Sequence, residues 1–516
     1  MNRVAFLLLT VPLSISLLGQ SVPVAKIGAG SLSGAIDPTS HVAIFKGVPF
    51  AAPPVGDLRW REPQPVKPWT GVRDAREFSP SCMQHVHGDF LPWTREYLVQ
   101  NGVSEDCLYL NIWTPQTNAK AKLPVIVYIP GGAFTEGSGE VPIYDGTNLA
   151  AKGLVVVTIN YRLGVFGFLA HPELTAESPH HSSGNYGLLD QIAALAWVQK
   201  NISAFGGDPH RVTLWGQSAG AFSVGALLAS PQAKGLFQRA MADSGLSVAG
   251  LPIKDLHTAE QDGVKFAADH HGTNLKHLRA IPATDLLNVQ RAGPILDGWL
   301  LPEPPNVVNA QGGGSDVPVI TGFQANDGLL SLPSLKSPED FNKYIESLYG
   351  SLATDFKRLY PAASLEEMQR SIQESTRDRE RVSMFLWAKQ RLQPYRSPIY
   401  IYFFTHAIPW PQHPEYGAFH SGELPYFFDN LRLLDRPWQA VDRQLAQTAS
   451  GYLKAFASTG DPNTAGLPEW RAVRPSLPET LDINDTIHPM TLADKAKYDF
   501  WLRYFSSPEA ARTPIF

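Results

Sequence analysis

Residues 205–220 read FGGDPHRVTLWGQSAG, and this stretch decides the fold. Its part 211–215 has the pattern of a short buried strand, and the small residues at 221–230 follow a helical pattern. The turn between them, Gly216-Gln217-Ser218-Ala219-Gly220, is a Gly-x-Ser-x-Gly motif in the strand–turn–helix context that gives it meaning. Such a sharp turn leaves no room for a Cβ two positions before or after the serine. It exposes the Ser218 hydroxyl, which needs a base, an orienting acid and oxyanion donors from elsewhere in the chain to act as a nucleophile.

Composition places the chain among globular proteins with a large core. It has 516 residues, of which 44% are hydrophobic and 18% charged. The net charge of −5 leaves no basic stripe, so we expect no nucleic acid partner. Length alone favours two or three domains, but large α/β proteins often form one. We expect a single domain over residues 22–516.

The N-terminus has the pattern of a targeting segment. Arg3 is followed by the almost wholly apolar run 4–19, and small or polar residues follow at 19–21. This predicts a secretory signal peptide over residues 1–21 and therefore a secreted or periplasmic protein. The alternative is an uncleaved membrane anchor, for which the run is short. No other apolar run is long enough to span a bilayer, so we expect no stable membrane insertion after the leader is removed.

The chain contains only two cysteines, Cys82 and Cys107. In an exported protein an isolated pair most simply forms one disulfide, and the alternative is two unrelated buried thiols. The segment between them holds His85 and His87, which are two residues apart. No further ligand follows at helix or hairpin spacing, so we interpret them as loop residues and predict no metal site.

Buried strands alternate with helical segments along the chain. The pattern predicts a large, mostly parallel sheet covered by helices on both faces, with ligands at the carboxyl ends of its strands. Long helical excursions at 251–316 and 330–395 cap it. The predicted strands are 105–115, which alternates, and 123–129, 154–160, 211–215, 317–322 and 398–405, with a long helix at 185–205 and a terminal one at 495–505.

Three of these strands end in segments suited to chemistry. Strand 123–129 leads into Pro130-Gly131-Gly132-Ala133-Phe134, where a glycine pair can present backbone N–H groups to an oxyanion; the alternative is an ordinary glycine turn. Strand 317–322 leads to Asn326-Asp327-Gly328. His420 lies in a small-residue loop after strand 398–405. The order serine, acid, histidine is the one expected for this architecture.

Several long motifs resemble one known family. FGGDPHRVTLWGQSAG is similar to the serine signature of the type-B carboxylesterases, which include cholinesterases, bacterial para-nitrobenzyl esterases and fungal lipases, and the resemblance is closest to the para-nitrobenzyl esterases. EDCLYLNIWTP resembles the family's second signature, around a disulfide cysteine. Further matches are FKGVPFAAPPVGDLRW, NYRLGVFGFLA and GNYGLLDQIAALAWVQKNI. The resemblance covers nearly the whole chain after the leader.

The resemblance implies an α/β-hydrolase fold whose excursions form an active-site gorge, and a type-B carboxylesterase catalytic domain over residues 22–516. It implies Ser218 as nucleophile, His420 as base and Asp327 as acid, with the N–H groups of Gly132, Ala133 and Ala219 as the oxyanion hole. Cys82 and Cys107 fall on the family's first disulfide. No cofactor and no metal are implied.

Three positions depart from the family pattern. Asp327 stands where glutamate is usual, so its loop must lie closer to His420. Gln217 replaces the commoner glutamate beside the serine, which argues against a site for a choline cation. Pro130 replaces an aromatic residue or histidine. The run Gly-Gly-Ala-Phe is associated in this superfamily with a roomy site that accepts hindered alcohols.

The resulting hypothesis is a secreted serine carboxylesterase that hydrolyses small-molecule carboxylic esters through an acyl-enzyme with a Ser-His-Asp triad. Alternatives within the family are a feruloyl or other aromatic-ester esterase and a lipase, although we find no long apolar lid. A non-catalytic adhesion-type binding module is the alternative outside enzymes, and it is disfavoured because all three triad positions carry competent groups.

Overall fold

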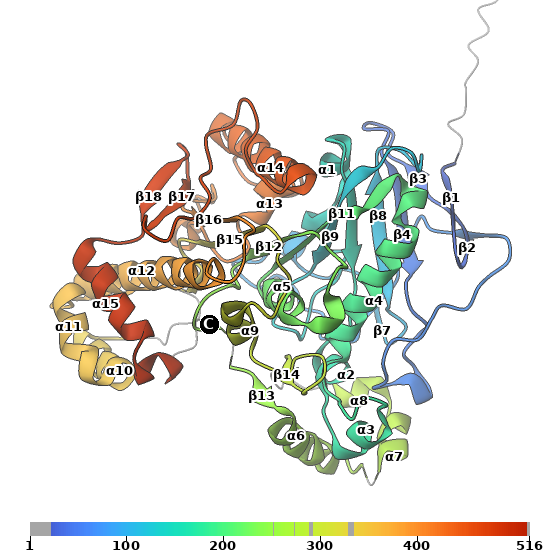
Figure 1. Ribbon diagram of the computed structural model, residues 1–516, viewed down its shortest axis with the longest axis horizontal. Helices are drawn as coiled ribbons and strands as arrows, with labels where there is room; N and C mark the ends of the chain where they lie inside the picture. The colour runs from blue at the N-terminus through green and yellow to red at the C-terminus, as the bar shows by residue number, and fades with distance from the viewer. Residues whose placement is uncertain (1–21, 251, 273, 288–292, 329–334, 513–516) are drawn as a thin grey trace, which may run out of the picture.

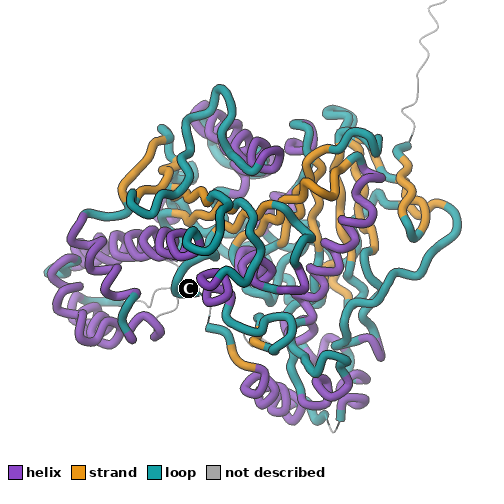
Figure 2. Tube along the Cα trace, in the orientation of Figure 1, coloured by secondary structure: helices purple, strands orange, loops and turns teal. Residues whose placement is uncertain are grey.

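The computed structural model describes residues 22–250, 252–272, 274–287, 293–328 and 335–512; the predicted leader lies outside them. Among these residues an eleven-stranded sheet crosses the molecule, with helices on both sides (Figures 1 and 2). The strands in sheet order are β18 (His488–Thr491), β17 (Glu479–Ile483), β16 (Ile399–Phe404), β15 (Val319–Gln324), β12 (Arg239–Asp243), β11 (Gly207–Gln217), β9 (Leu123–Ile129), β10 (Val155–Ile159), β8 (Tyr109–Thr114), β4 (Ala43–Pro49) and β3 (Ala35–Ile36).

The centre of the sheet is parallel, as predicted. Every neighbouring pair from β10 through β9, β11, β12, β15 and β16 to β17 runs parallel, and antiparallel strands complete both sides. Residues 125–129 of β9 are fully buried. Continuous burial is what a parallel strand covered on both faces requires, because both sets of alternating side chains then pack against helices.

The helices form two layers around the sheet. In Figure 1, α1, α13 and α14 lie on one side of it, and α4, α5 and α12 lie on the other. The helices are α1 (Thr147–Ala151), α2 (Gly164–Phe168), α3 (Pro172–Glu177), α4 (Tyr186–Asn201), α5 (Ala219–Ala229), α6 (Leu256–Asp269), α7 (Leu275–Ala280), α8 (Ala283–Leu286), α9 (Pro305–Gln311), α10 (Pro338–Tyr349), α11 (Ala353–Leu359), α12 (Leu365–Arg391), α13 (Leu424–Phe427), α14 (Ala440–Thr459) and α15 (Lys495–Phe505).

Short strands outside the main sheet pair with one another. β1 (Val24–Ile27), β2 (Gly30–Ser33) and β5 (Val72–Asp74) form one small sheet, and β13 (Lys254–Asp255) pairs with β14 (Ile295–Leu296). β6 (Ser81–Cys82) pairs with β7 (Val103–Ser104) beside the Cys82–Cys107 disulfide, so the predicted pairing is confirmed. Within the described residues, no helix combines the length and the apolar character needed to cross a bilayer.

Two predicted elements differ in detail. Segment 105–115 was expected to be an alternating strand, but β8 begins at Tyr109 and is almost continuously buried, because it lies inside the sheet between β10 and β4. The helix expected over 185–205 ends at Asn201, and a 3₁₀ turn follows. Gly206 closes that turn with a positive φ of 76°, which ends the helix and starts β11.

The carboxyl ends of the central strands lie at one edge. β11 is in register with β9 at Gly216 and Ile129, and with β12 at Gln217 and Asp243. Asp243 in turn pairs with Gly322 of β15. The segments that follow these strands therefore emerge side by side, which is the condition for residues far apart in the sequence to share a site.

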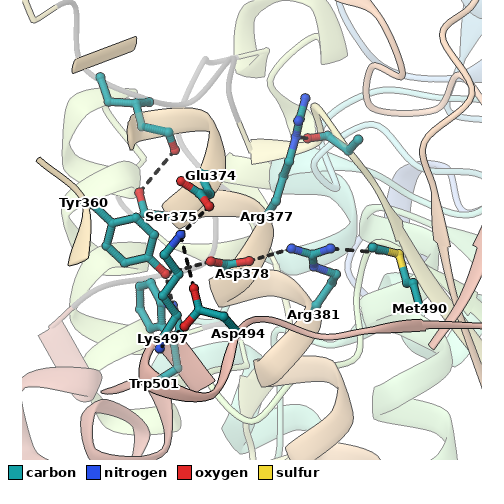
Figure 3. A network of polar contacts seen from close by, with 12 residues as sticks. Tyr360, Glu374, Ser375, Arg377, Asp378, Arg381, Met490, Asp494, Lys497 and Trp501 are labelled. Atoms are coloured by element: carbon teal, nitrogen blue, oxygen red, sulfur yellow. Dashed lines mark hydrogen bonds and ion pairs between the residues drawn. The ribbon is translucent and has the colours of Figure 1, made fainter. Parts of the chain in front are cut away.

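Helix α12 is held in place by a network of polar contacts that is buried around Asp378 and reaches the surface at Glu374 (Figure 3). Asp378 accepts hydrogen bonds from Tyr360 at 2.8 Å and from Arg381 at 2.5 Å. The Trp501 indole of α15 donates to the Tyr360 hydroxyl at 2.8 Å, and Lys497 of α15 pairs with Glu374. The predicted terminal helix thus docks its aromatic face and fixes α12 against the sheet.

Candidate active site

Ser218 lies at the strained turn between β11 and α5. Its φ of 57° and ψ of −125° lie in a region that costs a non-glycine residue roughly 1–3 kcal/mol. A Cβ on Gly216 would lie 2.4 Å from the Gly220 carbonyl oxygen, and one on Gly220 would lie 2.1 Å from that of Ile129. The two glycines are therefore needed for the close approach of α5 and β9, as the motif predicts.

The glycine loop after β9 packs directly on this turn. A Cβ on Gly131 would lie 2.7 Å from the Gln217 carbonyl oxygen, so only glycine permits the contact. Gly132 and Ala133 follow with φ values of 111° and 52°. Ala219 is the first residue of α5, so its N–H has no partner within the helix. Gly132, Ala133 and Ala219 line the same cavity as Ser218, where N–H groups could stabilise an oxyanion.

Asp327 follows β15 and is in direct contact with His420. Its Oδ1 is hydrogen-bonded to Nδ1 of the imidazole. Its Oδ2 accepts from the Ser244 hydroxyl at 2.5 Å and from the Gln324 N–H at 3.2 Å. The carboxylate is fully buried, and these donors compensate its loss of hydration. An Asp–His contact of this kind keeps a proton on Nδ1 and leaves Nε2 as the acceptor nitrogen of the ring.

His420 is also held from its other sides. The Trp93 indole donates to the His420 carbonyl oxygen at 3.1 Å, and the two rings meet edge to face. Phe90 stacks on Trp93, so the disulfide loop braces the histidine loop. The Gln217 amide lies 3.1 Å from Nε2 of His420. The residue before the serine thus contacts the imidazole through a neutral amide. A glutamate at position 217 would instead place a negative charge there.

Three more carboxyl groups are buried around Asp327: Asp243, Glu380 and Glu423. Burial is the main cause that raises the pKa of each, and the charge of Asp327 raises all three further. The pKa of Asp243 rises to about 7, although hydrogen bonds from Trp215 and Tyr402 act in the opposite direction. Like charges packed this closely repel one another, so each of these three buried carboxyl groups holds its proton more firmly than a carboxyl group in water would.

Asp243 gives a pH-dependent stability that can be measured. The unfolded chain releases this proton near pH 3.8 and the folded chain near 7, so the folded state binds more protons between those values. Stability therefore falls as pH rises through this window. Asp243→Asn keeps an acceptor for Trp215 and cannot ionise. We expect the Tm of Asp243→Asn minus the Tm of the parent to be larger at pH 8 than at pH 4.5. An equal Tm difference at the two pH values would contradict the raised pKa of Asp243.

The site opens into a cavity of about 1010 Å³. One wall is apolar, and the disulfide loop forms part of another through Gln84, Trp93 and Tyr97. His85 and His87 also face the cavity from this loop but are exposed. Across the described residues, no group of three or more His, Cys, Asp or Glu side chains is placed to hold a metal ion. The apolar wall includes Phe134, Phe168, Leu169, Phe222, Phe266 and Ile295.

The structure brings Asp327 and His420 into contact and places both in the cavity with Ser218, Gly132, Ala133 and Ala219. The sequence did not indicate that Ser244 holds Asp327, or that Trp93, an aromatic residue of the disulfide loop, holds the loop of His420. Ser244 could have been found, because it directly follows the buried strand β12 at the edge where ligands bind. Trp93 gave no such signal, since its partner is a backbone carbonyl more than 300 residues away.

Comparison with known proteins agrees with this geometry. The family whose sequence profile matches is described as "Carboxylesterase family", and the match covers residues 21–501. The chain is 38% identical over 482 residues to the fumonisin B1 esterase of Sphingopyxis macrogoltabida, covering 87% of this chain and 86% of that protein. It is also 38% identical over 478 residues to the para-nitrobenzyl esterase of Bacillus subtilis, covering 86% and 91%.

Solved structures show the same similarity in three dimensions. A structure titled PNB esterase superposes with a TM-score of 0.75 at 35% identity, covering 93% of this chain and 99% of that one. A second structure of the same title gives a TM-score of 0.77 at 33% identity. The chain therefore shares its overall fold with solved structures of this title.

Proposed function

Because the chain belongs to the carboxylesterase family, has the α/β-hydrolase fold and is a carboxylic ester hydrolase, we propose that it is a serine esterase using Ser218, His420 and Asp327. The single observation that supports this choice is the contact between Asp327 and Nδ1 of His420, two residues that line the same cavity as Ser218. Its substrates are small-molecule esters.

In the proposed mechanism the Ser218 oxygen attacks the ester carbonyl carbon while Nε2 of His420 accepts the hydroxyl proton. Asp327 keeps the other proton on Nδ1 and stabilises the imidazolium. The N–H groups of Gly132, Ala133 and Ala219 hold the oxyanion of the tetrahedral intermediate. His420 returns the proton to the departing alcohol, which leaves an acyl-enzyme on Ser218. Water then attacks this ester, with His420 again accepting and returning one proton, and the carboxylic acid is released.

A fluorophosphonate probe tests this proposal directly. The probe phosphonylates an activated serine, so the purified protein should be labelled stoichiometrically, and peptide mapping should place the label on Ser218. A folded protein that resists labelling and leaves esters intact would instead support the non-catalytic binding module. Ser244 is a useful internal control, because its hydroxyl is buried and engaged with Asp327.

We also propose that the protein is exported, with residues 1–21 as its leader and residues 22–516 as the catalytic domain. The Cys82–Cys107 disulfide supports this location, because such bonds persist in oxidising compartments. Expression of the full chain should yield a product in the culture medium or periplasm whose N-terminus begins near residue 22. Retention of residues 1–21 on a cytoplasmic product would contradict the proposal.

The cavity favours esters with a sizeable apolar group. Each methylene moved from water to the aromatic wall gains about 0.8 kcal/mol, so two more methylenes are worth roughly tenfold in kcat/KM. We expect kcat/KM to rise about tenfold from nitrophenyl acetate to butyrate. Phe222→Ala, which removes one ring from the wall, should flatten the series. A series that falls with chain length in the parent would contradict this expectation.

The panel also separates the alternative substrate classes. A hydroxycinnamate methyl ester turned over faster than the butyrate would favour an aromatic-ester esterase, for which the stacked Phe90 and Trp93 offer a matching surface. A steep rise that continues beyond octanoate would favour a lipase. A tertiary-alcohol ester measures whether the Gly131-Gly132-Ala133-Phe134 loop leaves room for a hindered alcohol.

A further inference from the structure

Asn326 connects the loop that carries Asp327 to the loop that carries His420. Its N–H donates to the Ala418 carbonyl oxygen at 2.9 Å, and its Nδ2 donates to the Tyr416 carbonyl oxygen at 3.0 Å. Asp327 is the next residue, and His420 comes two residues after Ala418. The two contacts thus fix the distance between the acid and the imidazole from just outside the cavity.

Arg377 of α12 determines which way the Asn326 amide faces. Its Nη2 donates to Asn326 Oδ1 at 2.7 Å, and its Nε donates to the Ala325 carbonyl oxygen at 2.8 Å. A guanidinium only donates hydrogen bonds, so Oδ1 must face it and Nδ2 is directed to Tyr416. The arginine thereby fixes the amide in the one orientation that joins the two loops.

The same helix holds the far end of the acid loop. Glu380 lies three residues after Arg377, on the same face of α12, and its Oε1 accepts from the Gly328 N–H at 3.1 Å. Figure 3 shows Arg377 extending away from Asp378, which belongs to the network that fixes α12 to α15. One rigid helix therefore supports the loop at residues 325, 326 and 328.

We propose that Arg377 and Asn326 are positioning residues for ester hydrolysis, acting through the Asp327–His420 contact; this rests on the proposed triad. Neither side chain lines the cavity, so substrate binding should not depend on them. Asp327 has one methylene less than the glutamate usual at this position, so its side chain has less reach to compensate for a displaced loop. A misplacement of about 1 Å can cost about 10²-fold in rate.

The test compares Arg377→Met with Arg370→Met. Arg370 is on the same helix but exposed, with Glu366 as its ion-pair partner, so its loss should leave activity at the parent value. For Arg377→Met we expect kcat per fluorophosphonate-titrated site to fall about 10- to 100-fold with KM within about twofold. The acid limb of the pH–kcat/KM profile should move to lower pH, because the imidazolium loses its fixed carboxylate. Arg377→Lys keeps the positive charge and can donate to one of the two acceptors, so it should recover part of kcat.

Asn326→Ala provides a second variant in case Arg377→Met does not fold. It removes the side-chain bond to Tyr416 and keeps the backbone bond to Ala418, and we expect the same change in kcat and pH profile on a smaller scale. Unchanged kcat per titrated site and an unchanged pH profile in folded variants would overturn the proposal, as would an effect confined to KM. If the fluorophosphonate probe does not label Ser218 in the parent protein, the proposed triad itself is wrong. Labelling of the parent with unchanged kinetics in the variants would instead contradict only the positioning role of Arg377 and Asn326.

Discussion

Replacing Ser218 with alanine is expected to lower kcat/KM for nitrophenyl butyrate at least about 10³-fold, which corresponds to about 4 kcal/mol of lost transition-state stabilisation. The hydroxyl supplies the atom that bonds to the acyl carbon, and no neighbouring group can replace it in the proposed mechanism. Its side chain makes no capping hydrogen bond to α5, so the variant should keep the Tm of the parent. Steady-state kinetics, probe labelling and thermal unfolding together measure this.

The matched control is Ser230→Ala, at the other end of α5. Ser230 accepts a hydrogen bond from the Gln232 N–H and does not line the cavity, so its loss should leave kcat/KM within about twofold. Turnover by Ser218→Ala at more than a few per cent of the parent rate would rule out Ser218 as the nucleophile. Loss of turnover in both variants would point to damage to the helix instead.

Asp327→Asn is expected to lower kcat about 10³- to 10⁴-fold with little change in KM, as the loss of the triad acid does in serine proteases. Ser244 and the Gln324 N–H donate to one side of residue 327, so an asparagine would place its oxygen there and its NH₂ against His420. That NH₂ must donate to Nδ1, which moves the imidazole proton to Nε2. His420 in this tautomer cannot accept the proton of Ser218.

Asp327→Glu and Glu423→Gln test the choice of acid. Glutamate is the usual family residue, but position 327 is fully enclosed, so the extra methylene should cost about 10- to 100-fold in kcat. Glu423 is fully buried, and burial, with the charges of Asp243 and Asp327, raises its pKa. Glu423→Gln should keep kcat within about tenfold. If it falls as far as Asp327→Asn, Asp327 is not the only acid on which the histidine depends.

The residues that sequence patterns located correctly are those with strong local signals. The turn around Ser218 is defined by Gly216 and Gly220. A Cβ at Gly216 would clash with Gly220 itself, and a Cβ at Gly220 would clash with the end of strand β9. Residues 123–129 are apolar throughout because both faces of β9 are covered. Both constraints determine which residue types occur at which spacing, so they can be recognised in the amino-acid sequence.

The supporting residues could not be predicted in the same way. Arg377 contacts Asn326 only because α12 packs beside β15, and an arginine in a charged helix gives no local sign of a buried partner. The contact between Gln217 and His420 likewise depends on how two loops 203 residues apart meet. The alternation seen at 105–115 was misleading, because the position of β8 inside the sheet outweighs its local pattern.

The Trp501–Tyr360–Asp378 connection has a consequence for biosynthesis. All the proposed reacting groups have been translated by residue 420, but the helix beneath the acid loop is fastened by an indole 81 positions later. A nascent chain can thus contain every triad member while α12 still lacks its clamp. Docking of α15 is therefore the step that completes the support of the acid loop, after every proposed reacting group has already been translated.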